Sequence, residues 1–268
     1  MSLPARAENV SVVRHALAGL ADRIGMDELG IGDLKTVVTE ACMNVVVHAY
    51  PTDHPGPLEV EAFPEASGLT VVVRDYGMGI QPRPDVDRPS LRIGLTLIAA
   101  LSQSFEIKGG VDRGTEIRMH LALEAREDGD GRDGAKRAPM PPSTERTELQ
   151  VGSPELVAPI LSRALSALAA RRQISVDRIS DAMLLSDAIS AGAPQGFGDG
   201  YVRLSIVDRA EGVELRVGPM ESGGAERLRS SLELPELGGS LESLADELGV
   251  DRDGDGDYLV VRIAALSA

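Results

Sequence analysis

The chain has 268 residues with a net charge of −15, no tryptophan and one cysteine. That length suffices for two ordinary domains, and a single cysteine excludes an intramolecular disulfide. The acidic charge argues against direct binding to nucleic acid or to an anionic membrane, because both need a basic surface.

The segment before residue 124 predicts an α+β domain. Apolar residues at helical spacing predict amphipathic helices, and short runs rich in β-branched residues predict strands. In chain order we expect two helices, two paired strands, a short apolar helix and two further strands, at Glu8–Ile24, Gly32–His48, Leu58–Phe63, Leu69–Asp75, Ile93–Leu101, Phe105–Lys108 and Thr115–Leu123.

A charged segment rich in glycine and proline then interrupts the pattern, and it predicts a flexible linker. Beyond it the same order returns, at Arg163–Ala170, Ile179–Ser190, Tyr201–Val207, Val213–Gly218, Ser240–Val250 and Asp257–Leu266. Coincidence is one explanation, since helices and strands alternate in many α+β domains. The matching order and spacing favour an internal duplication. We therefore expect one domain at 1–124, a linker at 125–146 and a second domain at 147–268.

The second predicted helix carries a polar pair, Glu40 and Asn44, within the sequence TEACMN. Residues four apart lie one turn apart on the same helix face. A carboxylate and an amide oxygen suit Mg²⁺, which takes hard oxygen ligands and keeps waters and phosphates of its own. A half-exposed polar stripe on a surface helix explains the pair equally well.

Three glycine-containing motifs follow. Asp75 ends a strand and precedes Gly77 and Gly79, which suits an acceptor that reads a base beside a backbone approaching a ligand closely. Gly94-Leu95 opens the third helix, whose first N–H groups favour phosphate. Gly114-Thr115 opens the last strand of this half, where the threonine hydroxyl can bond a ligand. Taken singly, each motif also fits an ordinary turn or helix cap.

Taken in order, E-x-x-x-N, D-x-G-x-G, G-L and G-T resemble the four nucleotide-binding boxes of the GHKL ATPases. Within that superfamily, the sequence TEACMNVVVHAYP and the first helix look most like the anti-sigma factor serine kinases. The resemblance covers residues 1–124 nearly end to end. It implies a two-layer α/β sandwich of the Bergerat type, with a mixed, mostly antiparallel sheet and helices on one face, here duplicated in tandem.

The resemblance also implies chemical roles for four side chains. Asn44 would bind the Mg²⁺ that bridges the phosphates of ATP. Glu40 would be the general base that takes the proton from an attacking serine hydroxyl. Asp75 would accept a hydrogen bond from the adenine amino group, with Thr115 supporting the adenine end beside it.

By the same resemblance, backbone positions complete the nucleotide site. Gly77 and Gly79 would let the backbone pass close to the nucleotide where the lid begins. Gly94 and Leu95 would present backbone N–H groups to phosphate, and Gly114 would permit the tight turn into the last strand.

Residues Gln81–Ile93 are expected to form the lid over this site. Arg83, Arg88 and Arg92 could reach phosphate, because a guanidinium matches its geometry. For two of the three, a solvated loop is the preferred interpretation. The segment matches a glycine-rich lid poorly.

The second half is expected to bind no ATP, because the chain's two asparagines are Asn9 and Asn44. The segment facing the E-x-x-x-N turn is Leu184–Ser190, where Asp187 is the acidic residue. The aspartates of Asp251–Asp257 match the start of an EF-hand loop, but Arg262 stands where a bidentate glutamate is required. We expect an acidic turn there instead.

The resemblance implies an anti-sigma-type regulator that uses ATP and Mg²⁺ to phosphorylate a serine of an anti-sigma antagonist (STAS) protein, that sequesters a sigma factor, or both. Arg14, on the exposed side of the first helix, is a candidate partner contact, and a solvated arginine explains it at least as well. A nucleotide-gated switch without catalysis is the alternative function.

Members of this type commonly pair as homodimers, so a dimer or an intramolecular pseudo-dimer is expected. The N-terminus lacks the basic and apolar regions of a signal peptide. A cytoplasmic protein without membrane contact is therefore expected.

Overall fold

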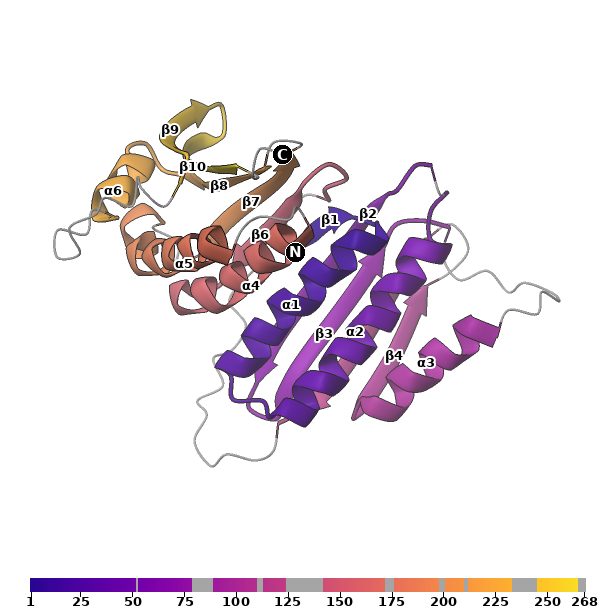
Figure 1. The fold of residues 1–268 in the computed structure, drawn as a ribbon. Helices are drawn as coiled ribbons and strands as arrows, with labels where there is room; N and C mark the ends of the chain where they lie inside the picture. The colour runs from indigo at the N-terminus through magenta and orange to yellow at the C-terminus, as the bar shows by residue number, and fades with distance from the viewer. Residues whose placement is uncertain are drawn as a thin grey trace. The chain divides into compact units, whose positions relative to one another are not determined.

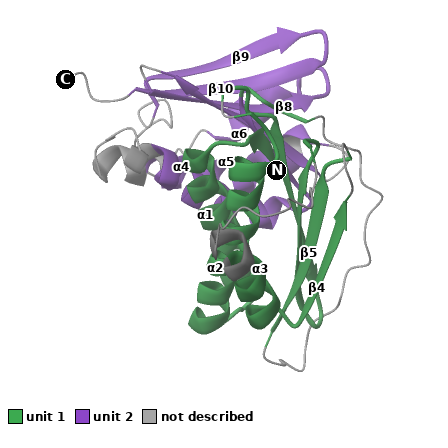
Figure 2. Ribbon diagram, turned by 90° about the vertical axis from the view of Figure 1, so that its right-hand side faces the viewer, with its two compact units in different colours: residues 1–145 green, residues 146–268 purple. Residues whose placement is uncertain are grey.

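The computed structural model describes residues 1–51, 53–78, 89–109, 113–123, 142–171, 176–197, 201–209, 212–232 and 245–264. The chain divides into two compact units, Met1–Glu145 and Arg146–Ala268 (Figure 2). Most of the predicted linker lies outside the described residues. Within the described part of the chain, no helix is long and apolar enough to span a membrane.

Unit 1 is an α+β sandwich of two layers. Its elements are β1 (Ser2–Pro4), α1 (Ala7–Arg23), α2 (Glu28–His48), β2 (Pro57–Glu65), β3 (Gly68–Asp75), α3 (Pro89–Leu101), β4 (Ser104–Gly109) and β5 (Thr115–Ala122). The strands lie in the order β4-β5-β3-β2-β1, and all neighbours pair antiparallel. The three helices cover one face of this sheet (Figures 1 and 2).

Alternation of side chains explains the two layers of unit 1. On β5, Ile117, Met119 and Leu121 are buried, while Arg118 between them is exposed. Side chains of alternate residues point to opposite faces of a sheet, so the apolar set faces the helices. On α2, apolar residues at helical spacing are completely buried, namely Leu34, Val37, Val38, Ala41 and Cys42. The polar stripe that carries Glu40 and Asn44 is therefore left at the edge of the core.

The helix α2 begins earlier than its apolar pattern predicted. Asp27 is the N-cap, and its carboxylate accepts a hydrogen bond from the Gly30 N–H at 2.8 Å. Such a cap satisfies an N–H group that has no partner within the helix. The helix consequently includes the glycine-containing turn before Leu34, which hydrophobic periodicity alone did not reveal.

Unit 2 has its elements in nearly the same order. They are β6 (Thr147–Val151), the short 3-10 turn η1 (Pro154–Leu156), α4 (Val157–Arg171), α5 (Val176–Gly196), β7 (Val202–Arg209), β8 (Gly212–Met220), α6 (Gly224–Ser231), β9 (Glu247–Asp253) and β10 (Gly256–Ala264). The strands lie in the order β6-β7-β8-β10-β9, again antiparallel. Within the described ranges and apart from η1, both units thus follow strand, two helices, two strands, helix, two strands.

One predicted element of unit 2 is contradicted at its C-terminal end. The expected helix Ser240–Val250 is contradicted at its end, where Glu247–Asp253 forms β9 and Val250 pairs with Leu259 of β10. Residues 240–244 lie outside the described residues. Among the described residues, the helix that precedes this hairpin is α6, which begins at Gly224 and, with 8 residues, is too short to show a periodic pattern. Pairing with β10 overrides the local helical spacing, as tertiary context commonly does.

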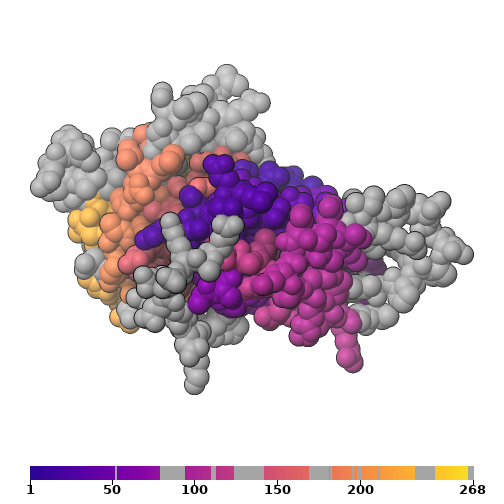
Figure 3. Space-filling model, turned by 90° about the horizontal axis from the view of Figure 1, so that it is seen from below, coloured from indigo at the N-terminus to yellow at the C-terminus, as the bar shows by residue number. Residues whose placement is uncertain are grey.

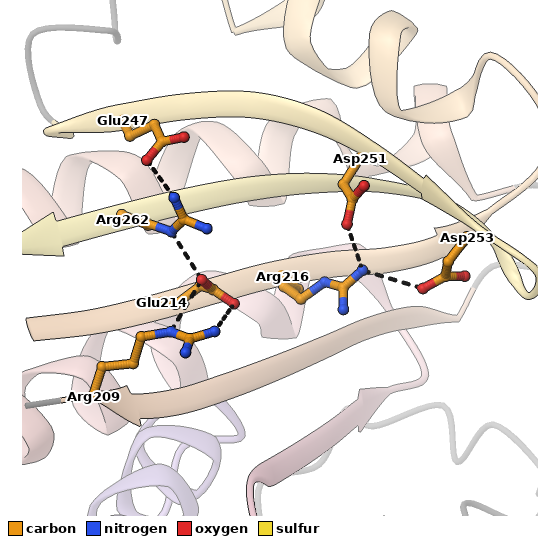
Figure 4. Close-up of polar contacts among 7 residues, drawn as sticks. All are labelled: Arg209, Glu214, Arg216, Glu247, Asp251, Asp253 and Arg262. Atoms are coloured by element: carbon orange, nitrogen blue, oxygen red, sulfur yellow. Dashed lines mark hydrogen bonds and ion pairs between the residues drawn. The ribbon is translucent and has the colours of Figure 1, made fainter.

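Alternating arginines and carboxylates bridge neighbouring strands of unit 2 (Figure 4). Glu214 on β8 is 5% exposed and accepts hydrogen bonds from Arg209 Nη2 at 3.0 Å and Arg262 Nε at 2.8 Å. These hydrogen bonds hold the pKa of Glu214 below its usual value, against the opposing effect of burial. The ion pairs connect β7, β8 and β10.

Candidate functional site

The helices α2 and α3 meet at Glu40. A Cβ added at Gly94 would lie 2.5 Å from Glu40 Oε2, so α3 approaches the carboxylate where α3 has no side chain. Figure 3 shows the violet N-terminal helices and the magenta segment of α3 side by side, and α2 contacts α3. The structure therefore brings together two motifs that lie more than fifty residues apart in the sequence.

Asn44 lies one turn beyond Glu40 on α2 and is half-buried. Its Nδ2 atom is inaccessible to solvent and has no hydrogen-bond partner among the described residues. A buried amide without a partner is costly, and it calls for an explanation such as a ligand or water. The Nδ2 group is a hydrogen-bond donor, so it would suit an acceptor such as a phosphate oxygen or a water. The amide oxygen of the same side chain is a hard ligand of the kind that Mg²⁺ takes together with waters and phosphates.

Asp75 ends β3 and is 5% exposed. Its Oδ1 accepts a hydrogen bond from the Gly77 N–H at 2.9 Å, and the Thr115 hydroxyl and N–H also donate to it. Burial raises the pKa of Asp75 and these hydrogen bonds oppose the rise. A carboxylate offers about four acceptor sites, so Asp75 retains capacity for one further donor. The structure thus places Thr115 in direct contact with Asp75.

The glycines around Asp75 are required by the chain itself. A Cβ on Gly77 would overlap the carbonyl of Ala49 at the end of α2. Gly114 has φ of +69°, and a Cβ there would overlap the Asp75 carbonyl. The Gly114 N–H donates to the Gly77 carbonyl at 3.1 Å. These contacts join the end of β3 to the end of α2 and the start of β5, a physical reason for both glycines that the sequence did not reveal.

The predicted start of the third helix is wrong. The helix α3 begins at Pro89 and not at Ile93, as proline suits the first helical position. Gly94 and Leu95 therefore lie beyond the first turn, where N–H groups bond within the helix, and in this structure they do not form its N-terminus. Gly79, Arg83 and Arg88 lie outside the described residues, as does the side chain of Arg92.

A hollow of about 400 Å³ opens over the groove between α1 and α2. Its lining includes three basic or titratable side chains and the proposed general base, and consists of Arg14, His15, Lys35, Thr36, Thr39 and Glu40. Glu40 thus faces the Gly94 backbone and also borders an open surface. Arg14 was predicted from the sequence as a candidate partner contact. Lys35 was not, because its position beside Arg14 depends on how α1 packs on α2.

The corresponding face of α5 in unit 2 is filled. Both α2 and α5 span 21 residues. Aligning them end to end matches four buried positions, namely 37, 38, 41 and 45 with 185, 186, 189 and 193, and it places Ala188 opposite Glu40 and Gly192 opposite Asn44. A Cβ on Gly192 would overlap Ser231 Oγ and lie 2.7 Å from Leu228 Cδ1. The helix α6 therefore packs directly on α5 where unit 1 has its polar pair.

The start of β10 also differs from the start of β5. Gly256-Asp257 corresponds to Gly114-Thr115, and Asp257 is 2% exposed. The Asp257 carboxylate accepts from Arg252 Nε at 2.7 Å and from the Gly223 N–H at 2.5 Å. In unit 2 the position that corresponds to Thr115 is therefore occupied by a carboxylate that already forms an ion pair with Arg252.

The EF-hand-like segment forms the β9–β10 hairpin, in agreement with the predicted turn. Asp251 and Asp253 accept from Arg216 Nη2 at 3.1 Å and 3.2 Å (Figure 4). Among the residues that the structure describes, no group of three or more His, Cys, Asp or Glu is placed to hold a metal ion.

The fold and the residue order of unit 1 define a nucleotide-binding ATPase domain. Residues 3–121 match the family described as histidine kinase-like ATPase domain. Serine-protein kinase RsbW of Bacillus licheniformis is 31% identical over 144 residues, which cover 49% of this chain and 89% of that protein. Serine-protein kinase RsbW of Halalkalibacterium halodurans is 31% identical over 140 residues, which cover 47% of this chain and 84% of that protein.

A shorter match, to serine-protein kinase RsbW of Bacillus velezensis, is 42% identical over 77 residues, or 29% of this chain and 48% of that protein. The chain belongs to the histidine kinase-like ATPase family, in the group of the RsbW serine-protein kinases.

Proposed function

We propose that unit 1 is an ATP- and Mg²⁺-dependent protein serine kinase of the anti-sigma type, which phosphorylates an anti-sigma antagonist (STAS) protein and also binds a sigma factor. The position of Glu40 carries the proposal. Its carboxylate lies against Gly94 on one side and borders the open hollow on the other. A general base must lie within hydrogen-bond reach of the hydroxyl proton that it removes, and that hydroxyl must in turn reach the γ-phosphate of the nucleotide.

Asn44 and Asp75 would bind opposite ends of the nucleotide. Bound ATP·Mg²⁺ supplies the phosphoryl group and the charge neutralisation that phosphoryl transfer needs. Asn44, whose Nδ2 has no partner among the described residues, would contribute its amide oxygen to the metal. Asp75, held by Gly77 and Thr115, would accept a hydrogen bond from the adenine amino group.

The hollow between α1 and α2 would receive the partner. Arg14 and Lys35 border it together with Glu40, so cationic groups and the base share one surface. A serine-bearing segment with acidic neighbours would be attracted to the two cations while its hydroxyl approaches the carboxylate.

We further propose that unit 2 is a duplicated copy that binds no nucleotide. The repeated element order supports the duplication. The packing of α6 on Gly192 and the Arg252–Asp257 ion pair support the loss of the site. Both features use the positions that Asn44 and Thr115 hold in unit 1.

Transfer of label from γ-labelled ATP to a panel of STAS-domain proteins tests the kinase proposal. Wild type should label at least one partner, and Glu40→Gln should lower the rate about 10²- to 10⁴-fold while still binding ATP. Glu28→Gln is the matched control, because Glu28 is an exposed carboxylate on the same helix. If wild type binds ATP and labels no partner, the protein is a nucleotide-gated switch and not a kinase.

A further inference from the structure

Tyr50 follows the end of α2 and is held in place by its surroundings. Its ring packs against Gly56, where any Cβ would overlap the ring. Burial is the main cause that raises the pKa of Tyr50 to about 12. The hydroxyl therefore keeps its proton at neutral pH, and it can donate one hydrogen bond and accept another.

The Tyr50 hydroxyl bridges two strands where their pairing ends. The last pair of the β2–β3 ladder joins Leu58 to Asp75. At the next position, the Tyr50 hydroxyl donates to the Pro57 carbonyl at 2.7 Å and accepts from the Tyr76 N–H at 2.8 Å. Pro57 has no N–H of its own to offer the facing strand. A side-chain hydroxyl thus replaces direct pairing immediately after Asp75.

Ala49, the C-cap of α2, holds the same turn after Asp75 through its backbone carbonyl. The Ala49 carbonyl accepts from the Met78 N–H at 3.0 Å. Ala49 and Tyr50 therefore fix the backbone N–H groups of Tyr76 and Met78, which flank Gly77. The Gly77 N–H in turn donates to Asp75 Oδ1 at 2.9 Å, so the path from Tyr50 to the Asp75 carboxylate consists of one short turn.

We propose that Tyr50 is a positioning residue for recognition of the nucleotide base, and that its hydroxyl sets the direction of the Asp75 carboxylate and thereby the preference for adenine over guanine nucleotides. The inference rests on the proposed function, in which Asp75 accepts from the adenine amino group. A fixed carboxylate accepts from that amino group and repels the carbonyl that guanine carries at the same ring position. A carboxylate free to shift can reach the other donors of guanine, so the preference falls.

Binding of MgATP and MgGTP to Tyr50→Phe tests the proposal. The variant keeps the ring and removes the bridge. Because Asp75 is then held less firmly, the ATP affinity should fall by up to about fivefold, the factor that a hydrogen bond of ordinary strength represents, and the ATP-to-GTP preference should fall by a similar factor. Tyr76→Phe is the matched control. It removes a hydroxyl that donates to Glu59 Oε2 at 2.7 Å but leaves the Tyr76 N–H in place, so its preference should equal that of wild type.

The variant Asp75→Ala distinguishes a failure of the proposed role of Asp75 from a failure of the proposed role of Tyr50. If Asp75→Ala leaves ATP affinity and base preference unchanged, the proposed role of Asp75 fails and the role of Tyr50 fails with it. If Asp75→Ala abolishes the preference while Tyr50→Phe retains the wild-type ratio, the Tyr50 inference alone is overturned. Amide exchange in wild type adds a measurement that needs no variant. The Tyr76 N–H should be protected like those of β3, and rapid exchange there would overturn the proposal.

Discussion

Substitution of Gly94 by alanine separates the position of Glu40 from the stability of the fold. The added Cβ would lie 2.5 Å from Glu40 Oε2, whereas the next nearest atom of Glu40 lies 3.5 Å away. Relief of the overlap needs a shift of that oxygen by about 0.5 to 1 Å, given that carbon and oxygen rarely approach closer than about 3.0–3.4 Å. Because the oxygen ends a flexible side chain, it can move without disturbing the core.

The expected result is a loss of catalysis without a loss of stability. A misplacement of about 1 Å can cost on the order of 10²-fold in rate, so we expect phosphoryl transfer to fall about 10- to 100-fold. Glycine in a helix interior is about 1 kcal/mol less favourable than alanine, so the free energy of unfolding should stay equal or rise slightly.

Single-turnover transfer of labelled phosphate to a STAS partner and chemical denaturation measure the two quantities. Gly32→Ala is the matched control, because Gly32 also lies inside a helix but its Cβ would meet no atom within 4 Å. That variant should gain stability and keep its activity. If Gly94→Ala transfers phosphate within twofold of wild type, the position of Glu40 does not control the reaction and the assignment of the base is refuted.

Two further predictions concern unit 2. Hydrogen bonds from Arg209, and to a smaller extent from Arg262, lower the pKa of Glu214, so the ionised carboxylate stabilises the fold above pH 4.5 and this contribution is lost as the pH falls through the lowered pKa. Glu214→Gln should therefore destabilise unit 2 by about 1–3 kcal/mol at neutral pH and should make its stability depend less on pH in the acid range. An unchanged dependence of stability on acid pH would contradict the role of this ion pair. Gly192→Asn should destabilise unit 2 by about 1–3 kcal/mol, because the new asparagine side chain would overlap Ser231. For the same reason it should not create a second ATP site, and a second nucleotide bound per chain in calorimetry would contradict the close packing of α6 on α5.

The polar pair on α2 could be predicted because it depends on helix geometry alone. Glu40 and Asn44 are four apart, and any helix places them on one face. The contact of Glu40 with Gly94 could not be predicted from spacing, since it depends on how α3 packs on α2. The resemblance between motif orders supplied that link before the structure did.

Other features depended on tertiary contacts without a local pattern. The alternation of β9 is weak, and its pairing with β10 decides its conformation, so the predicted helix Ser240–Val250 extended into residues that form a strand from Glu247 on. Gly77 was interpreted as a close approach to a ligand, while the structure shows that the Ala49 carbonyl also excludes a side chain there. The motif thus predicted that glycine is needed at position 77, and the packing against Ala49 supplies a reason that the motif did not contain.

Titration of MgATP into wild type and Asn44→Ala tests the central claim, that one chain carries a single working nucleotide site and that this site lies in unit 1. Isothermal calorimetry should give one nucleotide per chain for wild type. Binding that depends on Mg²⁺ should disappear in Asn44→Ala, because the second half of the chain contains no asparagine to replace it. Two nucleotides per chain, or undiminished Mg²⁺-dependent binding to Asn44→Ala, would contradict the account.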